Sequence, residues 1–342
     1  MSTALVIQTS FLGDVILTTP LIAELAKRGP VDVLVTPQGA TALANNPDIR
    51  TVLRYDKRGT YGSALGLWNT IKGIRARRPY DEAYLAQGSF RSGLLAMLTG
   101  AKERIGFASS TGRVLYTKQA RYRPEHHHAQ RIWSLAMYDC ADPPSAEQIR
   151  PRLYPSDAER EAVDVILRTN SPMSRPMVAL APGSAWGTKR WPYYVELAKR
   201  LADDFRIAVI GSAADAGIAA EILSELPADD VINGAGSLSL LASAELIGRA
   251  QVIVTNDSAP QHLASAMGTP TLSIFGPTVP EFGFGPLAER HVVAGHTALS
   301  CRPCDRHGPQ RCPLGHWRCM RELSAEYISS LLPQVLHPPV PV

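Results

Sequence analysis

The chain has 342 residues, of which 45% are hydrophobic and 19% charged. This balance is typical of a globular protein, and the length favours two domains. No stretch approaches the roughly 20 consecutive apolar residues that a membrane-spanning helix needs. The N-terminal sequence MSTALVIQTSFLGDV has no basic leader before its apolar run, so it predicts a first β-strand and not a secretory signal. We therefore expect a cytosolic protein.

The net charge of +4 is unevenly distributed along the chain. Residues 1–150 carry 19 Lys and Arg against 12 Asp and Glu, whereas residues 151–342 carry 16 against 19. A basic half favours an anionic partner, such as phosphates, an acidic sugar or a membrane surface. A solvated surface with an excess of Arg explains the same counts equally well.

The first half alternates short apolar strands with helical stretches. Predicted strands cover residues 4–9, 31–36, 51–56, 82–87 and 104–107, and predicted helices cover 15–29, 39–47, 63–77 and 91–99. Strands alternating with helices of this length are typical of parallel βαβ units with helices on both faces.

A Pro-rich polar stretch at 141–157 predicts a linker, and the alternation restarts beyond it. The second series of predicted strands covers 177–183, 206–212, 252–257 and 271–277, with helices from Pro192, near 215–226 and from Ala259. We predict an α/β protein with two Rossmann-like domains, 1–150 and 151–323, that face a central cleft. A last helix within 324–342 is expected to pack back on the first domain.

The segment SFLGDV follows the first predicted strand and opens the first helix. Ligands of open α/β sheets collect at the carboxyl ends of strands, so this turn is a candidate site. Gly13 permits close backbone approach, and Asp14 sits at the start of the helix. Local sequence leaves two interpretations of Asp14 open: a helix N-cap, or an ionised base that acts by its position.

The segment APGSAWGTKRWP, residues 181–192, follows the first predicted strand of the second domain. Its small residues let backbone N–H groups approach an anion, Ser184 offers a hydroxyl, and Lys189 is a point charge suited to phosphate. A solvated loop lysine is the other interpretation. The segment does not match the P-loop pattern, which argues against a Walker-type nucleotidase.

The segment VTNDSAPQHLASAMGTPTLSIFGP, residues 254–277, joins a strand to a helix that begins near Ala259. The free N–H groups of a first helical turn and the helix dipole form an anion site. Asp257 can accept hydrogen bonds from sugar hydroxyls. His262 either supports this turn or is a packed core histidine.

These segments and the Cys-rich CRPCDRHGPQRCPLGHWRCM occur in one order over residues 3–335. Together they resemble the ADP-heptose:lipopolysaccharide heptosyltransferases of glycosyltransferase family 9, and the Cys-rich tail is most similar to the heptosyltransferase II branch. The stretch 88–107 also resembles the family's segment near the acceptor. The resemblance implies a GT-B fold and transfer of heptose, with inversion, from ADP-L-glycero-D-manno-heptose to the phosphorylated Kdo- or heptose-bearing inner core of lipopolysaccharide.

The resemblance also implies roles for individual residues. On the acceptor side it implies a catalytic base at Asp14, with Ser10 beside it and contacts from Arg58, Arg91 and Arg104. On the donor side it implies diphosphate binding and catalytic assistance by Lys189, and donor contacts from Ser184, Asp215, Asp257, Ser258, Ala259 and His262. No catalytic metal or other cofactor is expected, because Lys189 and the helix turn would stabilise the leaving ADP. We expect a monomer that contacts the inner face of the cytoplasmic membrane peripherally.

Four of the five cysteines, Cys301, Cys304, Cys312 and Cys319, fall near the C-terminus with the spacing C-x2-C-x7-C-x6-C. Only one pair has the close spacing of a structural zinc site. A structural metal at these four positions and reduced thiols or an occasional disulfide remain alternatives. The run of histidines at 126–128 opens a predicted helix, where a capping or acceptor-side role competes with metal binding.

Other functions remain as alternatives. A different GT-B sugar transferase or a sugar-nucleotide epimerase would use another base on the same fold. A Rossmann oxidoreductase is disfavoured because G-x-G-x-x-G is absent after the first strand. A nucleic-acid-binding module is the most distant alternative, because the basic half lacks interleaved aromatic residues.

Overall fold

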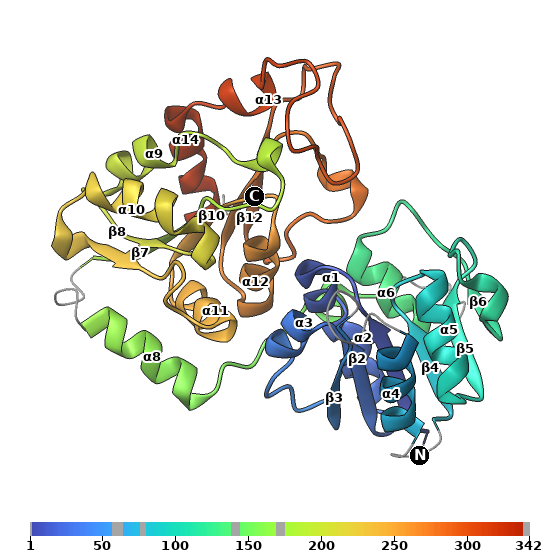
Figure 1. The fold of residues 1–342 in the computed structure, drawn as a ribbon. Helices are drawn as coiled ribbons and strands as arrows, with labels where there is room; N and C mark the ends of the chain where they lie inside the picture. Colours follow the sequence, from blue (N-terminus) through green and yellow to red (C-terminus); the bar gives the residue numbers. More distant parts are fainter. Residues whose placement is uncertain (1, 57–63, 76–79, 138–143, 169–174, 338–342) are drawn as a thin grey trace. The chain divides into compact units, whose positions relative to one another are not determined.

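The computed structural model describes residues 2–56, 64–75, 80–137, 144–168 and 175–337. The chain divides into two compact units, Met1–Tyr154 and Pro155–Val342, and each is considered by itself (Figure 1). This division lies four residues beyond the predicted boundary between 150 and 151, so residues 151–154 of the predicted linker belong to the first unit and 155–157 to the second.

The first unit is an α/β layer structure; η marks a 3₁₀ turn. Its elements are β1 (Ala4–Gln8), α1 (Leu12–Ile16), α2 (Thr19–Ala26), β2 (Val31–Val35), α3 (Pro37–Ala42), β3 (Thr51–Arg54), α4 (Ala64–Arg75), β4 (Glu82–Leu85), α5 (Phe90–Thr99), β5 (Glu103–Phe107), η2 (Arg113–Leu115), β6 (Lys118–Ala120), α6 (His128–Met137) and α7 (Ala146–Ile149). The six strands found in the described residues are parallel, in the order β3-β2-β1-β4-β5-β6.

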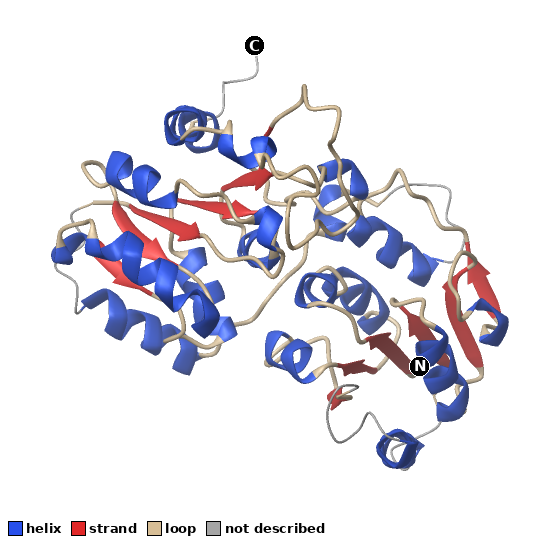
Figure 2. Cartoon of the chain, turned by 45° about the horizontal axis from the view of Figure 1, so that its top comes forward, coloured by secondary structure: helices blue, strands red, loops and turns tan. Residues whose placement is uncertain are grey.

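Helices cover both faces of this sheet, as Figure 2 shows. Apolar side chains of α2, α3 and α6, such as Leu21, Ala40 and Ile132, share a core with Val6 and Val33 on one face. Side chains of α4 and α5 form the core of the opposite face. Because both faces are covered, β1 and β2 are buried along their whole length and have near-continuous apolar sequences.

The second unit repeats this plan. Its elements are α8 (Asp157–Arg168), β7 (Met177–Ala181), η3 (Gly187–Lys189), α9 (Tyr194–Leu201), β8 (Arg206–Val209), η4 (Ala213–Asp215), α10 (Ala216–Ser224), η5 (Ala228–Asp230), β9 (Val231–Asn233), α11 (Leu240–Gly248), β10 (Val252–Asn256), α12 (Ala259–Met267), β11 (Thr271–Phe275), η6 (Pro280–Phe282), β12 (His291–Gly295), α13 (Arg318–Arg321) and α14 (Ala325–Leu336). The six strands of its described part are parallel, in the order β12-β11-β10-β7-β8-β9. Counted from the first strand of each unit, the two sheets have the same strand order.

The predicted α/β class and the two Rossmann-like units are confirmed, and every predicted strand is present. Sequence patterns missed β6 and β9, which have only three residues each, and also β12, α8 and α11. Among the described residues, no helix is both long enough and apolar enough to cross a membrane.

The last helix, α14, corrects one expectation. It was expected to pack on the first domain, but it packs against α9, β11 and β12 of the second unit. Its residues Ala325, Ile328, Leu332 and Val335 recur at three- and four-residue spacing, so they form one apolar stripe, and that stripe is part of the second unit's core.

Asp32 is a carboxylate buried within the apolar strand β2, with 1% of its surface exposed. Arg50 donates to it from Nε at 2.9 Å and from Nη2 at 2.7 Å, and the Tyr80 hydroxyl donates at 2.6 Å. Burial by itself raises the pKa of the Asp32 carboxyl, but the bonds from Arg50 and Tyr80 outweigh it and hold the pKa below its ordinary value. The three side chains thereby tie β2 to the starts of β3 and β4.

Replacing this carboxylate should destabilise the protein in a pH-dependent way. Asp32→Asn is expected to lower the free energy of unfolding at pH 7 by about 1–3 kcal/mol, because buried donors lose their acceptor. A carboxyl whose pKa is lowered by folding stabilises above its ordinary pKa, and this contribution is lost as the pH falls through the folded value. Urea unfolding of wild type and variant should therefore differ at pH 7, and the difference should be smaller at an acidic pH below the lowered pKa of Asp32. An equal difference at both pH values would contradict this assignment.

Candidate active site

Both candidate sites lie at the same topological position. In the first sheet β1 and β4 are neighbours, and the chain leaves them toward opposite edges of the sheet. In the second sheet β7 and β10 have the same relation. The loops after such a strand pair diverge and leave a crevice at the carboxyl edge, where open α/β sheets bind ligands. SFLGDV follows β1, the segment from Pro182 follows β7, and Asp257 follows β10.

Asp14 is the third residue of α1, and the N-cap position belongs to Phe11. The Asp14 carboxylate accepts a hydrogen bond from the Ser10 hydroxyl. Its other oxygen lies 3.1 Å from Nε2 of His128, the first residue of α6. Both side chains are mostly buried, with 15% of Asp14 and 16% of His128 exposed. The carboxylate is therefore held between two side-chain partners and is not the N-cap residue of its helix.

A polar framework joins the loops after β1 and β4. Thr9 Oγ1 donates to Oε1 of Gln87 at 2.5 Å, and the backbone N–H of Ser10 donates to Oε1 of Gln8 at 3.3 Å. Gln8 Nε2 in turn donates to Thr18 Oγ1, whose hydroxyl donates to the backbone carbonyl of Asp14 at 2.7 Å. These contacts fix the turn that carries Asp14.

The predicted acceptor arginines do not gather at one place. Arg91 is exposed in the first turn of α5, which begins shortly after the carboxyl end of β4. Arg104 lies near the beginning of β5, away from the carboxyl edge, and its guanidinium donates to the carbonyls of Leu115 at 2.7 Å and Ala101 at 3.0 Å. This geometry argues for a structural role of Arg104. Arg58 lies outside the described residues.

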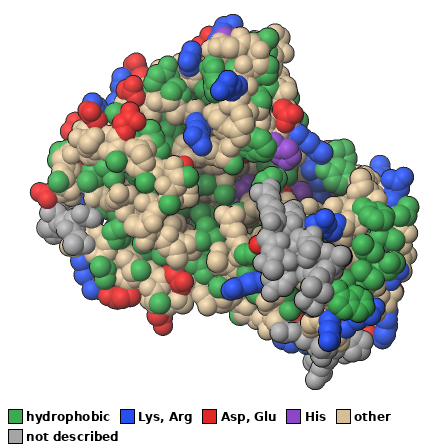
Figure 3. Space-filling model, viewed as in Figure 1, with side chains coloured by type: hydrophobic (Ala, Val, Ile, Leu, Met, Phe, Trp, Pro, Cys, Tyr) green, Lys and Arg blue, Asp and Glu red, His purple; other side chains and the backbone are tan. Residues whose placement is uncertain are grey.

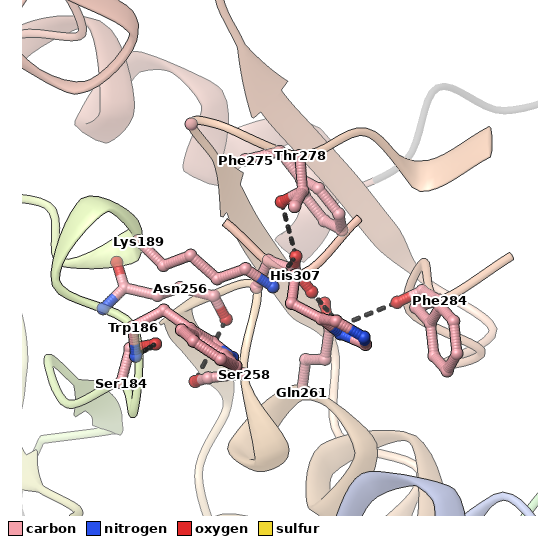
Figure 4. Close-up of polar contacts among 12 residues, drawn as sticks. Ser184, Trp186, Lys189, Asn256, Ser258, Gln261, Phe275, Thr278, Phe284 and His307 are labelled. Atoms are coloured by element: carbon pink, nitrogen blue, oxygen red, sulfur yellow. Dashed lines mark hydrogen bonds and ion pairs between the residues drawn. The ribbon is translucent and has the colours of Figure 1, made fainter. Parts of the chain in front are cut away.

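In the second unit, Lys189 and Asp257 form a buried ion pair, with Nζ 2.6 Å from Oδ2 and 10% and 9% of the side chains exposed. Thr278 Oγ1 donates to the same oxygen at 2.6 Å, and Gln261 Nε2 donates to Oδ1 at 3.2 Å. Figure 4 shows Lys189, Thr278 and Gln261 converging from separate segments of the chain, with Gln261 in the first turns of α12. Three protein donors thus occupy the Asp257 carboxylate, which leaves little capacity for a ligand and favours a role in orienting Lys189.

The ammonium of Lys189 has three N–H donors, and its bond to Asp257 uses one of them. Ser184 lies on the same loop, where its hydroxyl accepts from the backbone N–H of Trp186 at 3.2 Å. The Ser258 hydroxyl donates to the carbonyl of Gly183 at 3.3 Å and so joins this loop to the start of α12. Ser184, Lys189 and the Ser258–Ala259 turn are therefore brought together at one edge of the sheet.

The remaining predicted donor residues are placed around this group. His262 is buried in α12, with 5% of its surface exposed, which fits both a support of this turn and a packed core histidine. Asp215 caps its own turn, because it accepts from the backbone N–H and the hydroxyl of Ser212, both at 2.8 Å. It also lies against Gly183, where any Cβ would collide with its carboxylate.

Sequence patterns missed several residues that build the site. Asn256 donates from Nδ2 to the carbonyl of Pro182 at 2.8 Å, and its Oδ1 accepts from the backbone N–H of Trp191. Thr278 and Gln261 hold Asp257. The position of Asn256 at the end of a buried strand was a usable signal, whereas the contacts of Thr278 and Gln261 could not be read from local patterns. His128, which holds Asp14, belongs to the histidine run at 126–128, for which the sequence had suggested an acceptor-side role without naming a partner.

The Cys-rich segment packs onto the Lys189 loop. The backbone N–H and the hydroxyl of Thr188 both donate to the carbonyl of Pro309, and the Trp186 and His307 rings stack with centroids 6.0 Å apart. The segment is anchored by Arg302, whose half-buried guanidinium donates to the backbone carbonyls of Phe275, Gly276, Thr278 and His296. Burial lowers the pKa of Arg302.

Cys301, Cys304, Cys312 and Cys319 are free thiols. Burial, with the neighbouring cysteines, raises the pKa of Cys319 to about 11 and also raises that of Cys304. At Cys312 burial raises the pKa of the thiol, but hydrogen bonds from the backbone N–H groups of residues 314–317 outweigh burial and lower that pKa. Across the described ranges no group of three or more His, Cys, Asp or Glu side chains is placed to hold a metal ion, so the geometry does not support the predicted structural metal. Cys140 is outside these ranges.

Known structures first define the class of the fold. The structure of E. coli ADP-heptose LPS heptosyltransferase II aligns with a TM-score of 0.77 and 25% identity, over 98% of each chain. E. coli heptosyltransferase WaaC with ADP aligns with a TM-score of 0.73 and 18% identity, over 97% of this chain and 99% of that one. The chain thus has the GT-B fold of glycosyltransferases.

A model of glycosyltransferase family 9 (heptosyltransferase) matches residues 67–315. Lipopolysaccharide heptosyltransferase 2 of Escherichia coli (strain K12) is 29% identical over 295 residues, which cover 81% of this chain and 84% of that protein. The chain belongs to glycosyltransferase family 9, and it is an enzyme of that class. This membership disfavours the epimerase, oxidoreductase and nucleic-acid-binding alternatives.

Removing one partner of the buried Lys189–Asp257 ion pair should destabilise the folded protein. Asp257→Ala is expected to lower the free energy of unfolding by about 3–5 kcal/mol, because it leaves the Lys189 ammonium buried without a counter-charge. The double variant Lys189→Met/Asp257→Leu should recover most of this loss, since no buried charge remains. Denaturant titration of the single and double variants measures the coupling. Thr278→Val removes one neutral donor and serves as a control, with an expected loss of about 1 kcal/mol in the free energy of unfolding. If the single and double variants lose the same free energy of unfolding, the unpaired charge is not the cause of the loss.

Proposed function

We propose that this protein transfers heptose from ADP-L-glycero-D-manno-heptose to the phosphorylated inner core of lipopolysaccharide, on a Kdo- or heptose-bearing acceptor, with inversion at the anomeric carbon. The observation that carries the proposal is the Asp14 carboxylate, held by Ser10 and His128 at the switch point of the first sheet in a family 9 glycosyltransferase. An inverting transfer needs one base on the acceptor side, and we assign this role to Asp14.

In the proposed reaction, the acceptor hydroxyl oxygen attacks the anomeric carbon of the heptose while Asp14 takes the hydroxyl proton. The bond between that carbon and the diphosphate oxygen breaks, and ADP departs with the electron pair. Transition-state charge of this kind is best stabilised by donors already held in place. Because Ser10 and His128 orient the carboxylate before the acceptor arrives, the base acts by position.

Lys189 and the start of α12 are the groups proposed to receive the negative charge of the leaving ADP. Lys189 retains two N–H donors beyond its bond to Asp257, and its burial strengthens its attraction for a phosphate. The Ser258–Ala259 turn adds backbone N–H groups at the positive end of a nine-residue helix. Ser184 is the proposed hydroxyl donor to the diphosphate, and Asp215 lies beside the same loop in a place suited to the ribose.

On the acceptor side, Arg91 is proposed to contact the phosphorylated core, because it lies in the first turn of α5 at the ligand edge. The proposed acceptor is anchored in a bilayer by its lipid. We therefore propose peripheral contact with the inner face of the cytoplasmic membrane, by a monomer that requires no metal or other cofactor for transfer.

The proposal is tested by following ADP release from ADP-heptose with a panel of truncated core acceptors. Asp14→Ala should bind ADP-heptose with wild-type affinity in calorimetry, yet transfer about 10²–10⁴-fold more slowly, because the base is gone and the donor site is intact. Asp14→Asn keeps the size of the side chain and should be equally slow. Turnover near the wild-type rate in either variant removes Asp14 from the role of base, and no release with any acceptor removes the proposed function.

His128 is expected to position Asp14 and not to bind substrate. His128→Ala should therefore lower kcat about tenfold, with KM for donor and acceptor unchanged, since a looser base costs only transition-state stabilisation. His126→Ala makes the same chemical change two residues earlier and provides the matched control. If the two variants have the same kcat, or if KM changes instead, His128 does not act through Asp14.

A further inference from the structure

Three elements of the first unit, α4, α5 and η2, cover one face of the sheet. Helix α4 packs against α5, and α5 packs against η2. Their inward side chains, Ile71 and Ile74 of α4, Leu95 of α5 and the nearby Tyr116, belong to a single core. Their outward side chains therefore share the outer surface of one layer.

That outer surface is unusually apolar. Trp68 is 58% exposed, Met97 40% and Val114 74%, and Phe90, at the start of α5, is 54% exposed. Single exposed apolar residues are ordinary, but here four large ones fall on three adjacent elements. Phe90 and Met97 are seven residues apart in α5, so they lie on the same side of that helix.

The same surface carries one sign of charge. Lys72, Arg75, Arg91 and Arg113 are all exposed on these elements. The sequences of the three elements, ALGLWNTIKGIR, FRSGLLAMLT and RVL, contain no Asp or Glu. On α4, Trp68, Lys72 and Arg75 follow four- and three-residue spacing, which places them along one side of the helix. Figure 3 shows apolar side chains together with Lys and Arg over α5.

We propose that the surface formed by Trp68, Phe90, Met97 and Val114 with its surrounding Lys and Arg side chains docks the first unit on an anionic lipid bilayer. Aromatic and aliphatic side chains enter the boundary between headgroups and acyl chains, and each basic side chain near an anionic surface adds attraction. A second copy of the chain is a poorer occupant, because a symmetric contact would place like charges together.

The choice of a bilayer rests on the proposed function, in which the acceptor is anchored by lipid. The docking surface also adjoins the candidate site. Phe90 and Arg91 are the first two residues of α5, directly after the loop that contains Gln87. Gln87 accepts a hydrogen bond from Thr9, which lies on the Asp14 loop. Docking through this surface would thus leave the acceptor-side edge of the first sheet next to the membrane that holds the acceptor.

The experiment is flotation of the full chain with vesicles that contain no acceptor. Binding is expected to vesicles of phosphatidylglycerol and phosphatidylethanolamine, to weaken as salt is raised, and to be absent with phosphatidylcholine alone. The triple variant Trp68→Ser/Met97→Ser/Val114→Ser should bind at least about tenfold more weakly, because it loses the inserted apolar area. All three positions are exposed, so an unchanged thermal unfolding midpoint verifies the fold.

A matched control removes similar exposed apolar side chains from the second unit: Tyr327, Val293 and Leu314, which are 43%, 37% and 64% exposed. Tyr327→Ser/Val293→Ser/Leu314→Ser should float like wild type. The charge variant Lys72→Glu/Arg113→Glu should lose binding to anionic vesicles while keeping every apolar residue. Equal flotation of the wild type and both surface variants overturns the proposal. The proposal is also overturned if the wild type binds no vesicle but forms a dimer in solution, and the triple variant is a monomer.

Turnover separates this inference from the proposed function. On a deacylated, water-soluble acceptor the triple variant should match wild type, whereas on the acceptor embedded in vesicles it should be slower by the same factor as its loss of binding. An equal loss on both acceptors overturns the docking role. If wild type turns over no acceptor but the variants still differ in flotation, the proposed function fails and the docking surface is supported.

Discussion

The parallel pairing of strands is the constraint on which both candidate sites depend. Parallel strands point in one direction, so the carboxyl ends of β1 and β4, and likewise those of β7 and β10, meet at one edge of each sheet. After the two strands of each pair, the chain continues toward opposite sides of the sheet. The loops that diverge there carry the polar residues of the candidate sites. Both units repeat this strand order, which is why each has one candidate site at an equivalent position.

The charged groups at these edges are held before any ligand arrives. Ser10 and His128 hold Asp14, and Asp257 holds Lys189 within a buried ion pair that Thr278 completes. A buried charge without partners would be unstable, so each functional group requires a protein counterpart. The same partners restrict its orientation, which lowers the reorganisation that a transfer reaction would otherwise need. Stability and proposed catalysis therefore depend on the same contacts.

The first unit uses its two sheet faces differently. The layer of α2, α3 and α6 supplies His128 to the candidate site, whereas the layer of α4 and α5 presents an apolar and basic outer surface. In the second unit, the Cys-rich segment covers the Lys189 loop, and the carbonyl contacts of Arg302 hold it in place. The segment is thus a structural cover for the Lys189 loop, whereas the sequence had left a structural metal and reduced thiols as alternatives for its cysteines.

The sequence by itself determined the fold class, the two-unit organisation and the loops that carry Asp14, Lys189 and Asp257. These features are local, because apolar periodicity and Gly- or Pro-containing turns are set by neighbouring residues. Only the tertiary structure decided that His128 reaches Asp14 from 114 residues away, that Asp257 is occupied by Lys189 and Thr278, and that α14 belongs to the second unit. Such pairings depend on how the helices pack on a sheet, and a local sequence pattern does not predict which distant residue a side chain will contact. The three donors that surround its carboxylate favour Asp257 as a group that orients Lys189 over Asp257 as a sugar ligand.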